Sequence, residues 1–373
     1  MAILEDILAR AKSQPRAISA DELASLLALG APDEIALMRA AAYEVKLQCV
    51  GKNVSMRGII EAGNVCAKDC FYCGIRKGNA KVERFQLSRD EILRAAEENL
   101  RQQYGSLVIQ SGEIESEAHT EFVEDALREI MKMSGGSLGV TLSLGEQSRE
   151  TYRRWRVAGA SRYLLRIETS SPELYARLHP ADAGHSYARR RERLRLLRET
   201  GYQVGSGVMC GLPGQSLKDL ARDIVFFADE DLDMIGMGPY IPHRDTPLGA
   251  GAEFAPDFAA RQLRLGLNMI SATRLFLHDV NIASTTALQA LAGDGREQGL
   301  LAGANVIMPN ITETAYRRRY QLYDNKPCLD ENSEQCRSCL ARRIEKIGES
   351  INWNRRGDSP HFHKRAAARA PQP

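Results

Sequence analysis

The chain has 373 residues, and its 43% of hydrophobic residues can fill one large core or two ordinary ones. Its 50 basic and 48 acidic residues leave a net charge of +2 at pH 7, which gives no electrostatic reason to expect a nucleic acid or an anionic membrane as partner. No basic leader opens the chain, and no apolar run approaches the roughly eighteen residues that span a bilayer, so we expect a cytoplasmic protein with a small-molecule partner.

Residues 1–51 predict a helical cap over one end of the main domain. Ser19 and Glu22 have the spacing of a capping box ahead of an apolar run. Pro32 and Asp33 then open a second helical run that continues toward Tyr43.

Residues 52–312 alternate between apolar or β-branched segments and helical runs, among them 88–103, 120–133, 189–200 and 217–229. The eight strand candidates are 54–60, 106–112, 139–144, 162–168, 203–210, 234–241, 281–286 and 304–308. Eight such units in about 250 residues match a TIM-type (βα)8 barrel, so we predict an α/β fold of this kind. A doubly wound open sheet is the rival, because the same alternation builds either architecture.

The first strand leads directly into a loop with Cys66, Cys70 and Cys73 in C-x3-C-x2-C spacing. Three thiolates leave one iron of a 4Fe-4S cluster open, much as a catalytic zinc keeps an open position. A structural zinc site is the alternative, but it takes four ligands at short spacing, and no His lies within about forty residues of the loop. In a barrel this loop would lie at the mouth, where active sites are built.

Other strand ends are more polar than a packed barrel requires, namely 110–113, 141–143, 166–168, 284–286 and 305–308. Alternation along a strand places Arg166 and Glu168 on one face and Ile167 on the other. Burying the two charges without partners is costly, so each is expected to meet a ligand or another charge. A purely structural Arg166–Glu168 pair is the alternative.

Residues 205–214 contain four glycines after a strand, but their spacing matches neither a dinucleotide loop nor a P-loop. We expect a close backbone approach and a tight turn there, with Cys210 as a core residue.

Residues 313–353 form a predicted C-terminal extension with a second set of cysteines, Cys328, Cys336 and Cys339. Their spacing indicates another metal site, either an iron-sulfur cluster or zinc, with three free thiols as the alternative. Residues 354–373 are basic and lack apolar periodicity, so they are expected to be a flexible tail.

The first cysteine motif, with Phe71 and Tyr72 before its last cysteine, resembles the signature of the radical S-adenosylmethionine (SAM) enzymes. The resemblance implies that the open iron chelates the amino and carboxylate groups of SAM. An electron from the cluster then splits the sulfonium to give a 5'-deoxyadenosyl radical, and Tyr72 lies beside the adenosine.

From residue 54 to residue 339 the chain resembles the HydE family, radical SAM maturases of FeFe-hydrogenases that are related to biotin synthase and methylornithine synthase. The stretches that carry the resemblance are 64–77, 110–113, 141–146, 162–166, 236–243, 285–287 and 304–310.

By this resemblance Glu168 contacts SAM and Arg190 holds its carboxylate, which an arginine fork grips through two hydrogen bonds. Arg189 and Arg191 are the alternatives for Arg190. The remaining residues assigned to the cofactor site are Tyr72, Gln110 and Ser111.

The resemblance also implies an internal cavity for a substrate or anion, and a guanidinium with several hydroxyls suits a carboxylate-bearing, cysteine-derived molecule. The residues matched to its lining are Thr141, Arg166, Thr285, Thr286, Met308 and Tyr323. Ile167 departs from relatives that have His there, and it should face away from the cavity. The late cysteines match an accessory cluster site, 2Fe-2S or 4Fe-4S, that the family uses variably.

The implied function is assembly of the two-iron part of the hydrogenase active site, by radical chemistry on a small iron-bound, cysteine-derived precursor. Other hydrogenase maturases and an electron donor such as ferredoxin or flavodoxin are the implied partners. A methylornithine synthase-like enzyme is the alternative, whereas biotin synthase is disfavoured because only Cys210 lies on an inner strand. A carrier or scaffold of iron-sulfur clusters is the alternative of another class, although it would not need Arg166 and Glu168.

Overall fold

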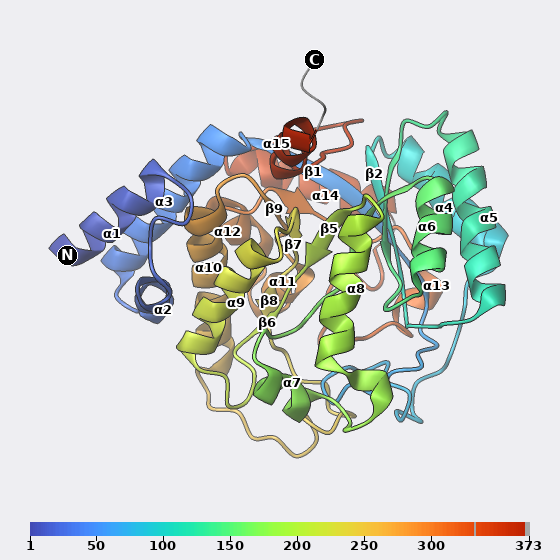
Figure 1. Cartoon of the computed structure of the whole chain (residues 1–373), viewed down its shortest axis with the longest axis horizontal. Coiled ribbons are helices and arrows are strands. Elements are labelled where there is room, and N and C mark those ends of the chain that lie inside the picture. Colours follow the sequence, from blue (N-terminus) through green and yellow to red (C-terminus); the bar gives the residue numbers. More distant parts are fainter. Residues whose placement is uncertain (332, 370–373) are drawn as a thin grey trace.

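A ring of parallel strands forms the centre of the computed structural model, which describes residues 1–331 and 333–369 (Figure 1). Neighbouring strands pair in the order β10-β1-β2-β3-β4-β5-β7-β9. Their bounds are β1 Asn53–Gly63, β2 Ser106–Ser111, β3 Gly139–Ser143, β4 Ala160–Leu164, β5 Gln203–Ser206, β7 Met234–Ile235, β9 Asn281–Ile282 and β10 Val306–Ile307.

Backbone hydrogen bonds between the last two strands close the ring. The amide of Ser284 donates to the carbonyl of Val306 at 2.8 Å, and the amide of Asn305 donates to the carbonyl of Ile282 at 2.9 Å. The eight strands therefore form a TIM-type (βα)8 barrel, which confirms the predicted fold, and the open-sheet rival is wrong.

Two of the predicted strands are interrupted halfway. Short strands β6 (Met209–Cys210) and β8 (Gly238–Pro239) pair with each other beyond the ends of β5 and β7. The break occurs where Gly207 passes Gly236 so closely that a Cβ at Gly207 would lie 1.8 Å from the Gly236 carbonyl oxygen. The glycines there permit a close backbone approach, as predicted, and Cys210 is fully buried in the core.

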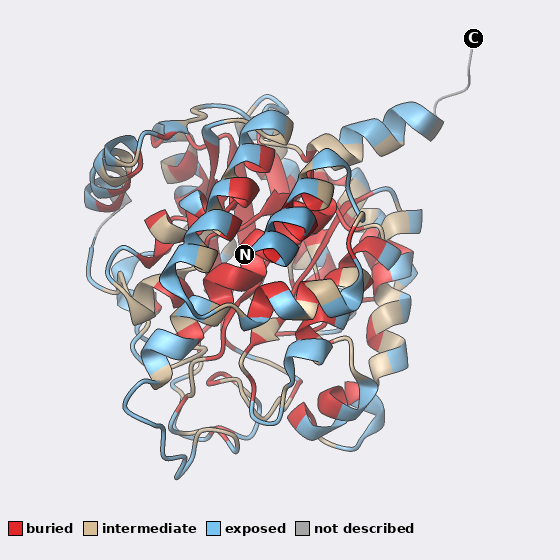
Figure 2. Cartoon of the chain, turned by 90° about the vertical axis from the view of Figure 1, so that its left-hand side faces the viewer, coloured by how far each residue is buried: buried red, intermediate tan, exposed pale blue. Residues whose placement is uncertain are grey.

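Helices surround the barrel and turn their apolar faces toward the strands (Figure 2). Capping boxes at Ser88 and Ser216 satisfy the first amides of α4 and α9, which is why these helices begin there. The outer elements are α4 Arg89–Arg101, α5 Glu117–Met133, α6 Arg149–Val157, α7 Pro172–Leu178, η1 Ala183–His185, α8 Tyr187–Glu199, α9 Leu217–Asp229, α10 Phe258–Leu277, α11 Thr286–Leu291 and α12 Gly295–Leu301.

The N-terminal segment forms helices α1 (Ala2–Ser13), α2 (Ala20–Ala28) and α3 (Pro32–Cys49). The predicted capping box of Ser19 and Glu22 is present at the start of α2. Helix α2 packs on α9 and helix α3 on α10, so the three helices cover one side of the barrel. The domain limits at residues 51, 312 and 353 stay a prediction.

The C-terminal segment contains α13 (Thr314–Arg317), α14 (Ser333–Lys346), β11 (Ser350–Ile351) beside β1, and α15 (Pro360–Arg369). The expectation of a flexible tail after residue 354 is wrong for residues 354–369, and residues 370–373 lie outside the described part. Buried Arg162 donates to the carbonyl of Arg356 at 2.6 Å, and His361 lies between Asp231 and Asp279 at 2.8 and 3.1 Å. Buried polar groups of the strands thus find their partners in this segment, which is why it packs against the end of the barrel opposite α7 (Figure 1).

Within the described residues, no helix combines the length and the apolar character needed to cross a bilayer.

Candidate active site

A cavity of about 340 Å³ opens at the C-terminal ends of the barrel strands, among the loops that follow them. Its lining includes the three cysteines of the first loop and also Cys328 and Cys336. A cavity of this size suits a small molecule together with a cofactor group. The position agrees with the rule that barrel active sites lie at this end.

The three cysteines of the first loop all line this cavity. Asn64 holds the start of the loop, since its amide group donates to the carbonyls of Glu83 and Arg319 at 2.9 and 2.8 Å. A Cβ at Gly112 would lie 2.2 Å from the Val65 carbonyl oxygen, so only glycine lets strand β2 end this close to the loop.

The thiols have the surroundings of metal ligands rather than of exposed nucleophiles. Cys66 Sγ accepts a hydrogen bond from the backbone amide of Glu113 at 3.3 Å. Burial raises the pKa of Cys66 and Cys73 and raises the pKa of Cys70 to about 12. As the side chains lie in the described part of the chain, no three His, Cys, Asp or Glu residues are grouped closely enough to hold a metal ion. The three cysteines nevertheless line one cavity, and three thiols are the donor set that a 4Fe-4S cluster takes, with release of the thiol protons on binding.

Four charged side chains join the cysteine loop to helix α8. Lys68 lies 3.0 Å from a Glu113 carboxylate oxygen and donates to Glu146 at 3.3 Å. Glu146 is fully buried, and its other oxygen lies 2.9 Å from Arg190 Nε. Glu113 Oε2 is 3.8 Å from Arg190, so the two carboxylates bridge the loop and the helix.

The structure separates the three consecutive arginines at the start of α8. Arg190 is 10% exposed in its side chain and lines the cavity. Arg189 lies between Glu115 at 2.8 Å and the buried Glu146 at 2.9 Å without lining the cavity, and Arg191 pairs with Glu230 at 2.6 Å. Of the three candidates, Arg190 is the one that faces the cavity.

Arg166 and Glu168 both line the cavity and form an ion pair of 3.0 Å. Burial raises the pKa of Glu168, although the charges of Arg166 and Arg190 oppose the shift. Strand alternation, the predicted reason for their lying on the same side, is wrong. Strand β4 ends at Leu164, and Glu168 has a left-handed backbone with φ of 66°. Ile167 is fully buried and turned away, as predicted.

Hydroxyl groups from the start of α11 and from the C-terminal segment also line the cavity. Thr286 Oγ1 and the Tyr323 hydroxyl lie 2.9 Å apart, and Thr285 Oγ1 is buried without a hydrogen-bond partner in the described part of the chain. Met308, Gln110, Ser111 and Tyr72 also line the cavity, in agreement with their predicted place. Thr141 does not line it, because it lies deeper on β3, two residues before Ser143, which does.

The second set of cysteines is divided between the cavity and the surface. Cys328 and Cys336 line the cavity, whereas Cys339 is exposed on α14. Arg296 Nη2 donates to Cys328 Sγ at 3.7 Å. The two sets of cysteines therefore open into the same space, which the sequence did not predict.

Several charged residues of the cavity were missed by the sequence reasoning. Glu61 on β1 forms a buried ion pair with Lys326. Lys68 and Arg296 also line the cavity, and Glu146 pairs with Lys68 from behind the lining. Lys68 carried a signal, since it lies inside the first cysteine motif. No sequence signal pointed to Arg296 or Lys326, because neither residue lies in a recognisable motif.

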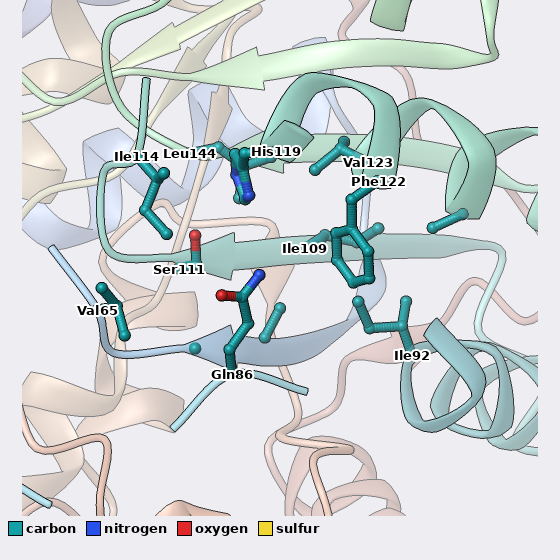
Figure 3. Close-up of a pocket in the computed structure, with 13 residues that line it drawn as sticks. Val65, Gln86, Ile92, Ile109, Ser111, Ile114, His119, Phe122, Val123 and Leu144 are labelled. Carbon is teal, nitrogen blue, oxygen red and sulfur yellow. The ribbon is translucent and has the colours of Figure 1, made fainter. Parts of the chain in front are cut away.

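A second cavity, of about 20 Å³, lies behind the cysteine loop between β1, β2 and helices α4 and α5 (Figure 3). His119, Ser111 and Gln86 face it together with apolar side chains such as Phe122. Both ring nitrogens of His119 lack a partner among the described residues, and burial lowers its pKa. This volume holds about one water molecule, so the cavity is a packing gap beside the main site.

Comparison with known proteins agrees with this geometry. The model of the Radical SAM superfamily matches residues 60–227, which include the first cysteine loop and Glu168. The crystal structure of a methylornithine synthase has the same fold, with a TM-score of 0.78 at 22% identity over 93% of this chain and 98% of that one. The FeFe-hydrogenase maturase HydG from Carboxydothermus hydrogenoformans gives a TM-score of 0.74 at 19% identity, over 93% of this chain and 77% of that one.

Sequence similarity is more specific than the shared fold. A 3-methylornithine synthase from Methanosarcina acetivorans is 24% identical over 89% of this chain and 89% of its own. The [FeFe] hydrogenase maturase subunit HydE from Thermotoga maritima is 44% identical over 309 residues, which cover 82% of this chain and 84% of that protein. Identity at that level over more than four fifths of both chains shows that the chain belongs to the HydE family of radical SAM enzymes of hydrogenase maturation.

Proposed function

We propose that this enzyme cleaves SAM reductively and uses the resulting radical on a small, cysteine-derived, iron-bound precursor of the FeFe-hydrogenase active site. One observation carries the proposal: the first cysteine loop and the pair of Arg166 and Glu168 line a single cavity of about 340 Å³. A cofactor at the loop and a substrate at Arg166 would share that cavity, so a radical formed from one would meet the other within the same site.

Cys66, Cys70 and Cys73 would hold the 4Fe-4S cluster that the radical SAM family uses. When bound, this cluster supplies the electron that splits SAM. Arg190 would grip the carboxylate of SAM, because its fork lines the cavity and Glu113 and Glu146 fix its direction. The other residues proposed to contact SAM are Tyr72, Gln110, Ser111 and Glu168.

Arg166 would bind the carboxylate of the substrate, with Thr285, Thr286 and Tyr323 supplying hydroxyl groups and Met308 an apolar contact. Its Nε is buried without a hydrogen-bond partner in the described part of the chain, so the guanidinium retains a donor for an anion. Thr141 lies below this layer and would support it from beneath.

The late cysteines would hold a second iron-sulfur cluster, with two or four irons. Cys328 and Cys336 are close to Arg296, whose positive charge would stabilise their thiolates. We further propose that the enzyme works in the cytoplasm, with other hydrogenase maturases and with ferredoxin or flavodoxin as electron donor.

The test is anaerobic reconstitution with iron and sulfide, followed by dithionite and SAM and an assay for 5'-deoxyadenosine. Wild type should form it, and Cys66→Ala, Cys70→Ala and Cys73→Ala should each abolish it, because a cluster held by two thiolates is not retained. Formation of 5'-deoxyadenosine by the triple variant would contradict the proposal.

The substrate site is tested separately by Arg166→Lys. An ammonium cannot reproduce the bidentate contact, so affinity for a thiazolidine carboxylate should fall about tenfold, while affinity for SAM should stay within about twofold. Parallel loss of both affinities with a lower melting temperature would mean that Arg166 serves only to pair with Glu168.

A further inference from the structure

His179 directly follows helix α7 and lies against Tyr72 of the first cysteine loop. The Tyr72 hydroxyl is 3.4 Å from His179 Nε2, and the two rings meet edge to face with their centroids 5.6 Å apart. Tyr72 lines the cavity, whereas His179 is 3% exposed and does not belong to the lining. His179 can therefore act on the cavity through the ring of Tyr72 without touching a bound molecule.

The second ring nitrogen of His179 fixes the direction of the hydrogen bond to Tyr72. His179 Nδ1 lies 2.8 Å from the carbonyl oxygen of Tyr175, and a carbonyl can only accept. Nδ1 therefore carries the hydrogen, and burial, which lowers the pKa of His179 to about 4, keeps the ring neutral. Nε2 is left as an acceptor, so the Tyr72 hydroxyl donates its one hydrogen to His179.

The segment that carries His179 is tied to the cysteine loop independently of the Tyr72 side chain. The carbonyl of Leu178 accepts a hydrogen bond from the backbone amide of Phe71 at 2.9 Å, and the Leu178 side chain is buried in a small apolar cluster. The ring of His179 also stacks on that of Tyr175, with centroids 4.0 Å apart. His179 thus presents Nε2 from a fixed base, and a change in its side chain leaves the backbone bond between loop and helix in place.

We propose that His179 is a positioning residue, whose Nε2 takes the hydroxyl hydrogen of Tyr72 and holds the Tyr72 ring in one orientation against bound SAM. A ring that is fixed before SAM binds loses little freedom on binding, so this hydrogen bond should strengthen SAM affinity. The inference rests on the proposed function, because it takes Tyr72 as a SAM contact. It makes SAM binding depend on a residue that lies outside the cavity lining.

Two substitutions of His179 separate the hydrogen bond from packing. Glutamine can place an amide oxygen near the position of Nε2, whereas the shorter asparagine reaches only to the position of Nδ1 and leaves the Tyr72 hydroxyl without its acceptor. In calorimetric titrations of the reconstituted protein, His179→Asn should bind SAM about fivefold more weakly than wild type, and His179→Gln should stay within about twofold of wild type. Equal losses in the two variants would overturn the inference, because His179 would then serve only to pack against Tyr175.

Tyr72→Phe removes the hydroxyl and leaves His179 in place, so this measurement stands even if His179→Asn fails to fold. SAM affinity should again fall about fivefold, and adding His179→Asn to this variant should cause no further loss. Unchanged affinity in Tyr72→Phe, or a second fivefold loss in the double variant, would overturn the inference. His119→Asn is the matched control, because His119 is also buried near the loop but its ring nitrogens have no hydrogen-bond partner among the described residues, and it should bind SAM as wild type does.

Formation of 5'-deoxyadenosine after reduction distinguishes a failure of the proposed function from a failure of this inference. If wild type binds SAM and forms none, the proposed function fails. If wild type forms it and His179→Asn binds SAM as tightly as wild type, only the role of His179 fails.

Discussion

Replacement of Glu146 by Gln tests whether the buried charges behind the cavity hold the site together. The Glu146 side chain is 0% exposed and lies 2.9 Å from Arg189 Nε and Arg190 Nε and 3.3 Å from Lys68 Nζ. Glutamine keeps the shape of the side chain and removes the negative charge. Lys68 and Arg190 would then share the remaining carboxylate of Glu113, and Arg189 would keep only Glu115.

Loss of one partner from a buried ion pair costs about 3–5 kcal/mol. We expect the lower end, about 3 kcal/mol, because Lys68 keeps Glu113 at 3.0 Å and Arg189 is about one-third exposed. Arg190 would also lose the contact that fixes its direction, so SAM affinity should fall about tenfold, or roughly 1.4 kcal/mol.

The free energy of unfolding is measured by anaerobic urea titration, and SAM affinity by calorimetry on the reconstituted protein. Glu115→Gln is the control, because Glu115 pairs with the same Arg189 at 2.8 Å but is 49% exposed. That variant should lose less than about 1 kcal/mol and should bind SAM normally. If Glu146→Gln behaved like the control in both measurements, the network would not support the site and the reasoning would be refuted.

Three further outcomes are expected. Hydrogen bonds from His361 to Asp231 and Asp279 raise the pKa of His361 to about 9, above its unfolded value of 6.5, so its stabilising contribution is complete below pH 6.5 and is lost as the pH rises through 9. His361→Gln should therefore reduce the melting temperature at pH 6 but not at pH 10. Burial raises the pKa of Asp223 to about 7 from 3.8, so the folded state binds the proton more tightly and stability falls as the pH rises from about 4 to 7. Asp223→Asn should remove that decline in pH-dependent urea titrations and should stabilise the protein by about 1–3 kcal/mol at pH 8, and an unchanged slope would contradict the assignment. Replacement of Cys328, Cys336 and Cys339 by serine should lower the iron content and leave 5'-deoxyadenosine formation intact. Complete loss of 5'-deoxyadenosine formation in a folded variant would contradict this expectation.

The geometry that depends on short-range spacing was predictable. The C-x3-C-x2-C loop needs only its own few residues to bring Cys66, Cys70 and Cys73 together, and the loop follows a strand that apolar patterning identifies. Counting eight such strands was enough for the barrel, and the barrel rule then places the loop at the mouth of the cavity.

Alternation along a regular strand predicted that Arg166 and Glu168 lie on one side, and they do, but not for that reason. Alternation requires a regular strand, but β4 ends at Leu164 and the left-handed backbone of Glu168 turns its side chain back to Arg166. Strand patterning also could not give the position of Thr141 along the barrel axis. Thr141 was expected to line the cavity but lies deeper, because its depth depends on the register of β3 with β2 and β4.

By itself the sequence determined the cysteine loop, the barrel and the polar character of the strand ends, because each follows from spacing within one segment. Only the tertiary structure decided which of three consecutive arginines faces the cavity, that residues 354–369 pack against the opposite end of the barrel, and that Arg296 lines the cavity with Cys328 and Cys336. These features join segments that are far apart in the chain. Their positions follow from the pairing of buried polar groups, and such pairing depends on the whole folded arrangement and not on any local pattern.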